Sequence, residues 1–354
     1  MSFHAKVTNR TLSSHLPRGG GSHVGKMRTF CLLLVGVLLS SCGEGKDTVH
    51  PLDDTLRLNH LQCEGTHNSY HVQPNEMTAP SWSYTMAPMA EQLDTQGVRK
   101  LEIDVHWDAD LRAFQVYHLP RFDQVSTCPT FVDCITGVRD WSRDHPGHHP
   151  IFIQIEPKTL PAADTPDRLA ALSALDAEIL SVFAPEEVIT PDEVQGARDT
   201  LDQAVTEDGW PTLGQTRGRV LFFLNCSRED CVAYANEGSG LDGRLIFADS
   251  EEGDSWSAVR IQNTPNADAR AAVEAGYLVR TFADGISDLL ADGSNDLEAA
   301  LASGAHMIST DVPAPRPDMD YFVEIPGGTP SRCNPITAPP GCTSLDIEDP
   351  SRLR

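Results

Sequence analysis

The chain has 354 residues, of which 51 are acidic and 27 are basic, so its formal net charge at pH 7 is −24. This excess of negative charge repels the phosphate backbone of nucleic acids and argues against DNA or RNA as a partner. About 300 residues would remain after removal of a targeting segment, which is enough for one large α/β barrel or for two ordinary domains.

The N-terminal segment has the pattern of an export signal. Residues 27–41 place the basic Arg28 before a short apolar run, which is typical of a signal peptide and too short to span a bilayer. The run leads into the sequence LSSC, ending at Cys42, which resembles a bacterial lipobox. We therefore expect an exported lipoprotein, anchored through an acylated Cys42 on the periplasmic or cell-surface side of a bacterial membrane. An ordinary secretory signal, with Cys42 as a plain thiol, is the alternative.

The segments on either side of this signal follow from the same interpretation. Residues 1–26, rich in Gly, Ser, His and Arg, are expected to be disordered or to be a misassigned extension before a start at Met27. Residues 42–55 are predicted to be a polar tether. Residues 56–354 are predicted to form a single domain that ends in a tail containing Pro and Cys.

Short apolar runs alternate with amphipathic stretches through this domain. Eight runs have the length and composition of strands: 59–66, 98–106, 114–118, 151–156, 219–225, 244–248, 277–282 and 305–310. Helices are predicted between them over 86–95, 131–143, 166–183, 191–205, 265–275 and 294–302. This alternation favours a closed, parallel (β/α)8 barrel of the TIM type. A doubly wound open sheet is the alternative, but no Gly-rich turn follows the first strand.

The cysteines after Cys42 fall into close pairs, apart from Cys63. Their spacing is not that of a zinc site, and export favours disulfides, so we predict bridges Cys128–Cys134, Cys226–Cys231 and Cys333–Cys342. Cys63 lies in an apolar stretch and is predicted to be a buried free thiol.

Polar side chains gather where the predicted strands end, which is where a barrel of this type carries its active site. His67 and Asn68 follow the first strand. In the second strand Glu102, Asp104 and His106 occupy alternate positions and so share one face. Two carboxylates that project together into a barrel mouth repel each other unless a cation binds between them.

The next two strands extend this pattern. His118 ends the third strand, and the fourth places Gln154, Glu156 and Lys158 on one face. The three carboxylates and the Asn68 amide oxygen are a set of oxygen ligands that suits Ca²⁺, and Mg²⁺ less well. Zinc would prefer more His or Cys. A solvent-exposed Glu156–Lys158 pair with no role in binding is the alternative for the fourth strand.

The segments GTHNSY, LEIDVHWD, VYHLP and IFIQIEPK, in this order, resemble the X-region of the phosphatidylinositol-specific phospholipase C superfamily. The resemblance covers about residues 59–160 and is greatest to the calcium-dependent bacterial branch. It implies a distorted β/α barrel, Ca²⁺ at the strand ends, and cleavage of the glycerol–phosphate bond of phosphatidylinositol or a related phosphodiester.

The resemblance also implies roles for individual residues. His67 and His118 match the two catalytic histidines of the family. Its calcium ligands correspond to Asn68, Glu102, Asp104 and Glu156. Candidates for substrate binding are Lys158, Arg121 and His106. After His118 this chain has Leu-Pro where the eukaryotic enzymes have Gly-His, so the contacts beyond the second histidine differ.

Two other functions remain open from the sequence. A glycerophosphodiester phosphodiesterase acts on soluble, deacylated lipids, and GAHMISTDVP resembles its last strand, but its first strand carries His-Arg-Gly where this chain has His-Asn-Ser. A non-catalytic surface lipoprotein that binds calcium or another ligand is the second. We expect a monomer whose partners are a phospholipid or other phosphodiester and the membrane. An apolar rim for that membrane would draw on Trp82, Tyr84, Met86 and Met89, unless these residues simply pack in the core.

Overall fold

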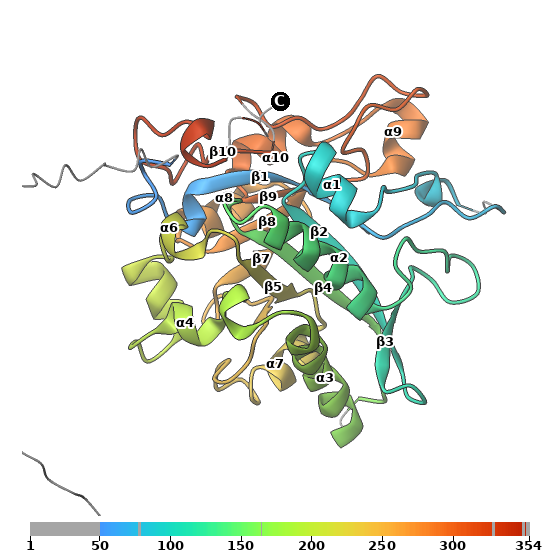
Figure 1. Cartoon of the computed structure of the whole chain (residues 1–354), viewed down its shortest axis with the longest axis horizontal. Coiled ribbons are helices and arrows are strands. Elements are labelled where there is room, and N and C mark those ends of the chain that lie inside the picture. The colour runs from blue at the N-terminus through green and yellow to red at the C-terminus, as the bar shows by residue number, and fades with distance from the viewer. Residues whose placement is uncertain (1–49, 77–78, 164, 328–329, 349–350, 352–354) are drawn as a thin grey trace, which may run out of the picture. The chain divides into compact units, whose positions relative to one another are not determined.

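Eight parallel strands wind into a nearly closed barrel (Figure 1) in the order β6-β5-β4-β2-β1-β9-β8-β7. This computed structural model describes residues 50–76, 79–163, 165–327, 330–348 and 351. The strands are β1 Leu61–Thr66, β2 Lys100–Asp108, β4 Ile151–Thr159, β5 Val220–Leu224, β6 Phe247–Ala248, β7 Val259–Ile261, β8 Leu278–Phe282 and β9 Met307–Thr310. A parallel bridge between Asp249 and Val259 joins the two ends of this order. The predicted fold class is confirmed.

The prediction was wrong about one barrel strand. The run at 114–118 forms β3 (Ala113–Val116), which pairs antiparallel with the end of β2 and lies outside the barrel. β2 is nine residues long, and the Asp108 carboxylate accepts hydrogen bonds from the backbone N–H groups of Asp110 and Leu111, so the chain turns back as a hairpin. The missing barrel strand is β7, whose three residues are too few to give a periodic signal.

The helices mostly lie where the sequence predicts them. These are α1 Met89–Thr95, α2 Phe131–Asp144, α3 Pro166–Val182, α8 Ala267–Glu274 and α10 Leu297–Ser303. The hydroxyls of Thr130 and Thr165 cap α2 and α3, and Gly304 ends α10 in the left-handed conformation.

The helix predicted over 191–205 is broken in two. α4 (Pro191–Gln195) ends at Gly196, whose φ is 57°, and Thr200 caps a new start for α5 (Leu201–Gln203), which runs into a π-helical turn over Ala204–Asp208. Elements that the sequence did not reveal are α6 Leu213–Thr216, α7 Arg228–Tyr234, α9 Ile286–Asp292, the strand β10 Ser331–Cys333 and the 3₁₀ turns Leu58–His60, Pro80–Trp82, Pro185–Glu187 and Ser344–Asp346. β10 pairs antiparallel with β1.

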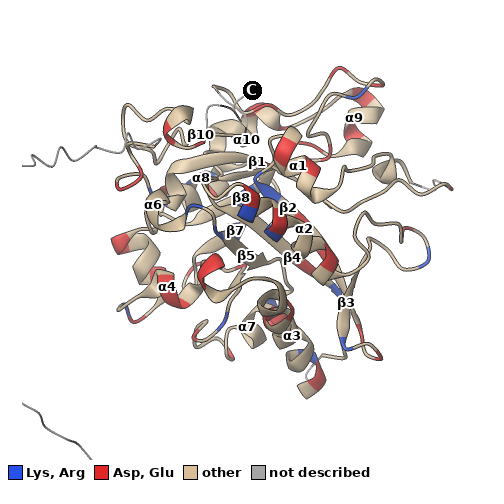
Figure 2. Cartoon of the chain, in the orientation of Figure 1, with Lys and Arg blue, Asp and Glu red and all other residues tan. Residues whose placement is uncertain are grey.

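Charged and polar side chains of β2 and β4 project into the barrel interior. The register aligns Glu102 with Gln154 and Asp104 with Glu156, so alternate residues of β2 and β4 face the interior together. Between them Leu101, Ile103 and Val105 are fully buried against the surrounding layer. Figure 2 shows basic positions on the barrel strands and many acidic positions on the helices around them.

The three cysteine pairs are disulfides as predicted, and Cys63 is a buried free thiol. Burial raises the pKa of the Cys63 thiol, so it stays protonated and unreactive. Disulfides of this kind fit a chain that folds outside the reducing cytosol. The predicted signal peptide, the N-terminal extension and the acylated Cys42 lie outside the described residues. No helix among the described residues is long and apolar enough to cross a membrane.

Gly65 leaves the space into which the Lys100 side chain packs. A Cβ atom on Gly65 would lie 2.7 Å from the Lys100 Cβ, which is closer than real contacts allow. We therefore expect Gly65→Ala to lower the free energy of unfolding by about 1–3 kcal/mol through overpacking. Gly137→Ala in α2 is the control, because its added Cβ meets nothing within 4 Å and should be neutral or stabilising. Denaturant unfolding measures both, and equal stabilities would contradict the assignment.

Candidate functional site

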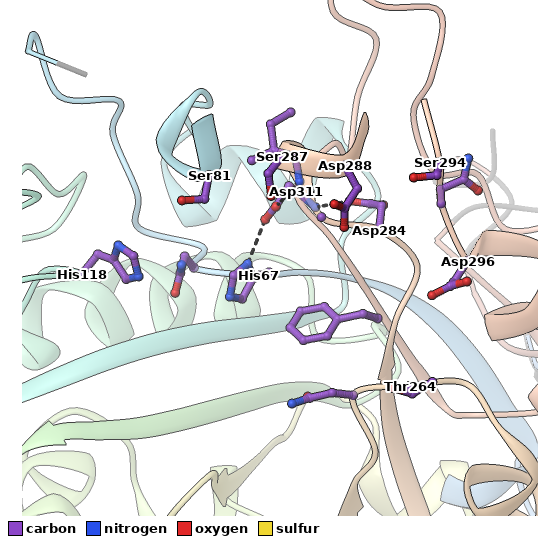
Figure 3. Close-up of a pocket in the computed structure, with 16 residues that line it drawn as sticks. His67, Ser81, His118, Thr264, Asp284, Ser287, Asp288, Ser294, Asp296 and Asp311 are labelled. Carbon is purple, nitrogen blue, oxygen red and sulfur yellow. Dashed lines mark hydrogen bonds and ion pairs between the residues drawn. The ribbon is translucent and has the colours of Figure 1, made fainter. Parts of the chain in front are cut away.

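A cavity of about 570 Å³ opens at the carboxyl ends of the barrel strands (Figure 3). His67 and Asn68 after β1, Asp284 after β8 and Asp311 after β9 line it, together with His118 from the loop that follows β3. The structure thus brings both predicted catalytic histidines to one cavity, although His118 arrives from a hairpin and not from a barrel strand.

Three predicted metal ligands meet beside this cavity. Glu102, Asp104 and Glu156 each offer a carboxylate oxygen, and these atoms lie within 4.8 Å of one another. We call them the carboxylate cluster. Neither oxygen of the fully buried Asp104 accepts a hydrogen bond in the described part of the chain, although buried carboxylates are normally satisfied. A buried carboxylate that accepts no hydrogen bond and lies beside two further carboxylates is what a hard cation would satisfy, so the residues fit calcium.

Two buried cations hold Glu102 in place. The ammonium of Lys100 and the guanidinium of Arg280 each lie 2.7 Å from Glu102 Oε2. β2 and β8 are separated by two strands, so the Arg280–Glu102 contact crosses the barrel interior. Burial opposes ionisation, but Lys100 and Arg280 outweigh it and hold the pKa of Glu102 well below its usual range. Glu102 is therefore ionised at neutral pH.

The pKa of Asp104 is shifted in the opposite direction to that of Glu102. Burial, with the neighbouring Glu156 and Glu102 carboxylates, raises the pKa of Asp104 to about 8 against the opposing effect of Lys158. The Lys158 ammonium lies 3.4 Å from Asp104 Oδ2 and 2.5 Å from Glu156 Oε1. Asp104 is thus the member of the cluster that most needs a positive charge nearby in order to ionise.

Asn68, the fourth predicted ligand, is positioned by two tyrosines. Its backbone has a φ of 44°, a left-handed conformation that Asn tolerates better than most residues. The amide donates to Tyr84 Oη at 3.2 Å, and its oxygen accepts from Tyr70 Oη at 3.3 Å. These contacts hold the side chain at the cavity wall.

His67 is paired with a carboxylate that the sequence did not single out. Its Nδ1 lies 2.9 Å from Asp311 Oδ1, and the other Asp311 oxygen accepts from the backbone N–H of Ile286 (Figure 3). Burial lowers the pKa of His67, but Asp311 and Glu102 outweigh it and raise the pKa above the usual value. Nε2 faces Glu102 Oε1 at 3.8 Å, which places the imidazole between Asp311 and the carboxylate cluster.

His118 is also paired with an aspartate, and a third histidine shares it. His118 Nδ1 lies 2.8 Å from Asp123 Oδ2, and Nε2 of the buried His71 lies 2.9 Å from the same oxygen. His71 Nδ1 faces the backbone carbonyl of Tyr84, which can only accept, so that nitrogen carries a hydrogen. Burial lowers the pKa of His118 and outweighs the opposing effect of Asp123.

The remaining predicted site residues lie outside the cavity lining. Both nitrogens of His106 are engaged, with Thr159 Oγ1 at 2.8 Å and the Tyr117 carbonyl at 2.9 Å, and burial lowers its pKa to about 4. Arg121 is exposed on a turn with φ 71°, four residues after Tyr117. Lys158 contacts the carboxylate cluster.

Sequence reasoning missed Asp311, Asp123, His71, Lys100 and Arg280. Asp311 directly follows β9, so the strand-end rule that selected the first four segments could have found it. Lys100 stands two positions before Glu102, so the same alternation that places Glu102 and Asp104 on one face could have identified it. Asp123 lies in a loop, where no periodicity indicates which way a side chain points.

Comparison with known proteins agrees with this geometry. A family model described as Ca²⁺-dependent phosphoinositide phospholipase C matches residues 56–111 and 109–335. The chain belongs to this family, and so to the phosphoric diester hydrolases. Comparison with curated protein sequences gives no significant match.

The solved structures of two phospholipases share the fold. The apo form of a calcium-dependent phosphoinositol-specific phospholipase C from a Pseudomonas species has a TM-score of 0.58 at 18% identity, covering 80% of this chain and 97% of that one. A Ca²⁺-dependent phosphatidylinositol-specific phospholipase C from Streptomyces antibioticus has a TM-score of 0.53 at 20% identity, covering 72% and 95%. At these identities the likeness shows a common fold and no more.

The two histidine–aspartate pairs should titrate differently in the calcium-free protein. We expect the pKa of His67 to lie above 6.5 and that of His118 below it, when each imidazole is followed by NMR in the presence of chelator. An aspartate favours the imidazolium of its partner. Asp311→Asn should therefore lower the pKa of His67 and leave that of His118 unchanged, and Asp123→Asn should lower the pKa of His118 and leave that of His67 unchanged. Equal pKa values, or a change at the wrong histidine, would contradict the pairing.

Proposed function

We propose that this phospholipase family member is a calcium-dependent phosphodiesterase that cleaves the glycerol–phosphate bond of phosphatidylinositol or a closely related phosphodiester. The observation that carries the proposal is the convergence, at one barrel mouth, of the carboxylate cluster with the His67–Asp311 and His118–Asp123 pairs. Two acid–base groups and a site for a hard cation are what in-line attack on phosphorus requires.

The reaction begins at the inositol 2-hydroxyl, which attacks the adjacent phosphorus as one histidine takes its proton. The other histidine gives a proton to the departing glycerol oxygen, so a cyclic inositol phosphate and diacylglycerol leave. We assign His67 to the nucleophile, because it lies beside the carboxylate cluster, and His118 to the leaving group. Calcium, held by Asn68, Glu102, Asp104 and Glu156, would supply charge to the phosphoryl oxygens and acidify the hydroxyl.

The aspartates prepare the two histidines for these steps. Asp311 and Asp123 each bind Nδ1 of their histidine, which fixes the ring and leaves Nε2 for the substrate. Both aspartates are themselves fixed, Asp311 by the Ile286 N–H and Asp123 by His71. The acid–base groups are therefore oriented before substrate binds, which reduces the entropic cost of reaching the transition state.

Membrane access is part of the proposal. Trp82, Tyr84, Met86 and Met89 are no more than 8% exposed, so they pack in the core and form no rim. Instead, the loop that carries His118 and Asp123 exposes the apolar side chains of Leu119, Phe122 and Val125 at 38%, 66% and 49%. Together with acylation at Cys42, this loop would bring a monomeric enzyme to lipid on the outer side of the membrane despite its negative charge.

A substrate panel tests the reaction. We expect the full chain to release cyclic inositol phosphate from phosphatidylinositol with Ca²⁺ and to lose this activity with chelator. Glycerophosphoinositol should be a poor substrate. Preferential cleavage of glycerophosphoinositol would instead support the glycerophosphodiester phosphodiesterase alternative. No turnover of either compound would support the non-catalytic lipoprotein.

Alanine substitution tests the histidines. His67→Ala and His118→Ala should each lower kcat by about 10²–10⁴-fold, the usual contribution of a positioned acid or base, with little change in Tm. His145→Ala is the control, because His145 caps α2 outside the cavity lining and should keep full activity. An active His67→Ala protein would remove that residue from the mechanism.

A further inference from the structure

Lys158 reaches the carboxylate cluster from the same strand that supplies Glu156. The two residues are two positions apart on β4, so their side chains project to the same side. The Lys158 ammonium lies 2.5 Å from Glu156 Oε1 and 3.4 Å from Asp104 Oδ2. Within the described residues, the ion pairs of Asp104 and Glu156 are with Lys158 alone.

The three cations around the cluster differ in how firmly they are held. Lys100 and Arg280 are no more than 1% exposed, and they also bind Ser309 Oγ, so they are built into the barrel. The Lys158 side chain is 30% exposed, and its ammonium is paired with the Asp104 and Glu156 carboxylates. Its four-carbon stem can move the ammonium without any change in the strand. Lys158 is thus the cation that can leave.

A divalent ion and an ammonium cannot share the same oxygens. Calcium that uses the Asp104 and Glu156 oxygens needs the atoms that Lys158 contacts, and two positive charges a few ångströms apart repel strongly in a partly buried site. The two cations therefore compete for one position. Burial lowers the pKa of His118, and the nearby Lys158 ammonium adds to this effect, so Lys158 lies within electrostatic range of the second predicted catalytic histidine.

We propose that Lys158 is a tethered counter-ion that occupies the cation position of the carboxylate cluster without calcium, is displaced by calcium, and then binds the substrate phosphate. This inference rests on the proposed function. It also reconciles two roles that the sequence leaves in conflict, since Lys158 cannot neutralise the cluster and contact substrate at the same time. Calcium binding would thereby prepare the site for the anionic group of the substrate.

Calcium titration of the full chain tests the competition. Isothermal calorimetry should give a Kd for Ca²⁺ that is about tenfold lower in Lys158→Met than in the wild type, because the competing charge is gone. Lys158→Arg keeps a cation and should bind Ca²⁺ like the wild type. Arg270→Met, which removes one positive charge from the exposed face of α8, is the control for net charge and should also leave the Kd unchanged.

Kinetics with phosphatidylinositol vesicles at saturating Ca²⁺ test whether the displaced Lys158 binds the substrate phosphate. Lys158→Met should raise KM while it lowers the Kd for Ca²⁺, and a variant that merely folds badly would weaken both. A wild type that binds Ca²⁺ while Lys158→Met binds it no more tightly overturns this inference and leaves the proposed function standing. If no variant binds Ca²⁺, both fail together. An unchanged KM overturns the role of Lys158 toward the phosphate.

Discussion

Two buried carboxylates and a third that is partly exposed can lie side by side at the end of a barrel only where positive charge reaches them. The structure brings that charge to Glu102 through the buried Lys100 on β2 and the buried Arg280 on β8, which come from two strands that are not neighbours. Removing ions from water is costly unless pairing and hydrogen bonds replace the lost hydration, and both cations also bind Ser309. The space for Lys100 in turn requires glycine at position 65.

This internal compensation divides the carboxylate cluster into two parts. Glu102 is neutralised from within the barrel, whereas Asp104 and Glu156 face the exposed Lys158. The first part is fixed in position, because Lys100 and Arg280 are no more than 1% exposed and both bind Ser309. The second part is the one that, on our proposal, exchanges Lys158 for calcium.

Each of the two histidines is held by an aspartate at its Nδ1 atom, but the surroundings of the two pairs differ. Asp311 comes from the end of a barrel strand and lies close to the charged cluster, while Asp123 comes from a loop and is shared with the buried His71. Identical side chains therefore acquire pKa values shifted in opposite directions. In the calcium-free protein His67 therefore holds its proton more tightly than His118 does.

The sequence alone determined the elements whose signals are local. Alternation revealed β2 and β4 and the shared face of Glu102, Asp104, Glu156 and Lys158, and cysteine spacing determined the three disulfides. Tertiary structure alone decided what depends on contacts between distant segments. β7 is too short to show periodicity. β3 lies outside the barrel because the chain turns back at the end of the long strand β2 and pairs with it. Asp123 reaches His118 from a loop, and Arg280 reaches Glu102 through the barrel interior. The alternation of residue types along a strand indicates which face of the strand a side chain occupies. Which residue of another strand or loop it contacts is decided only when the barrel closes.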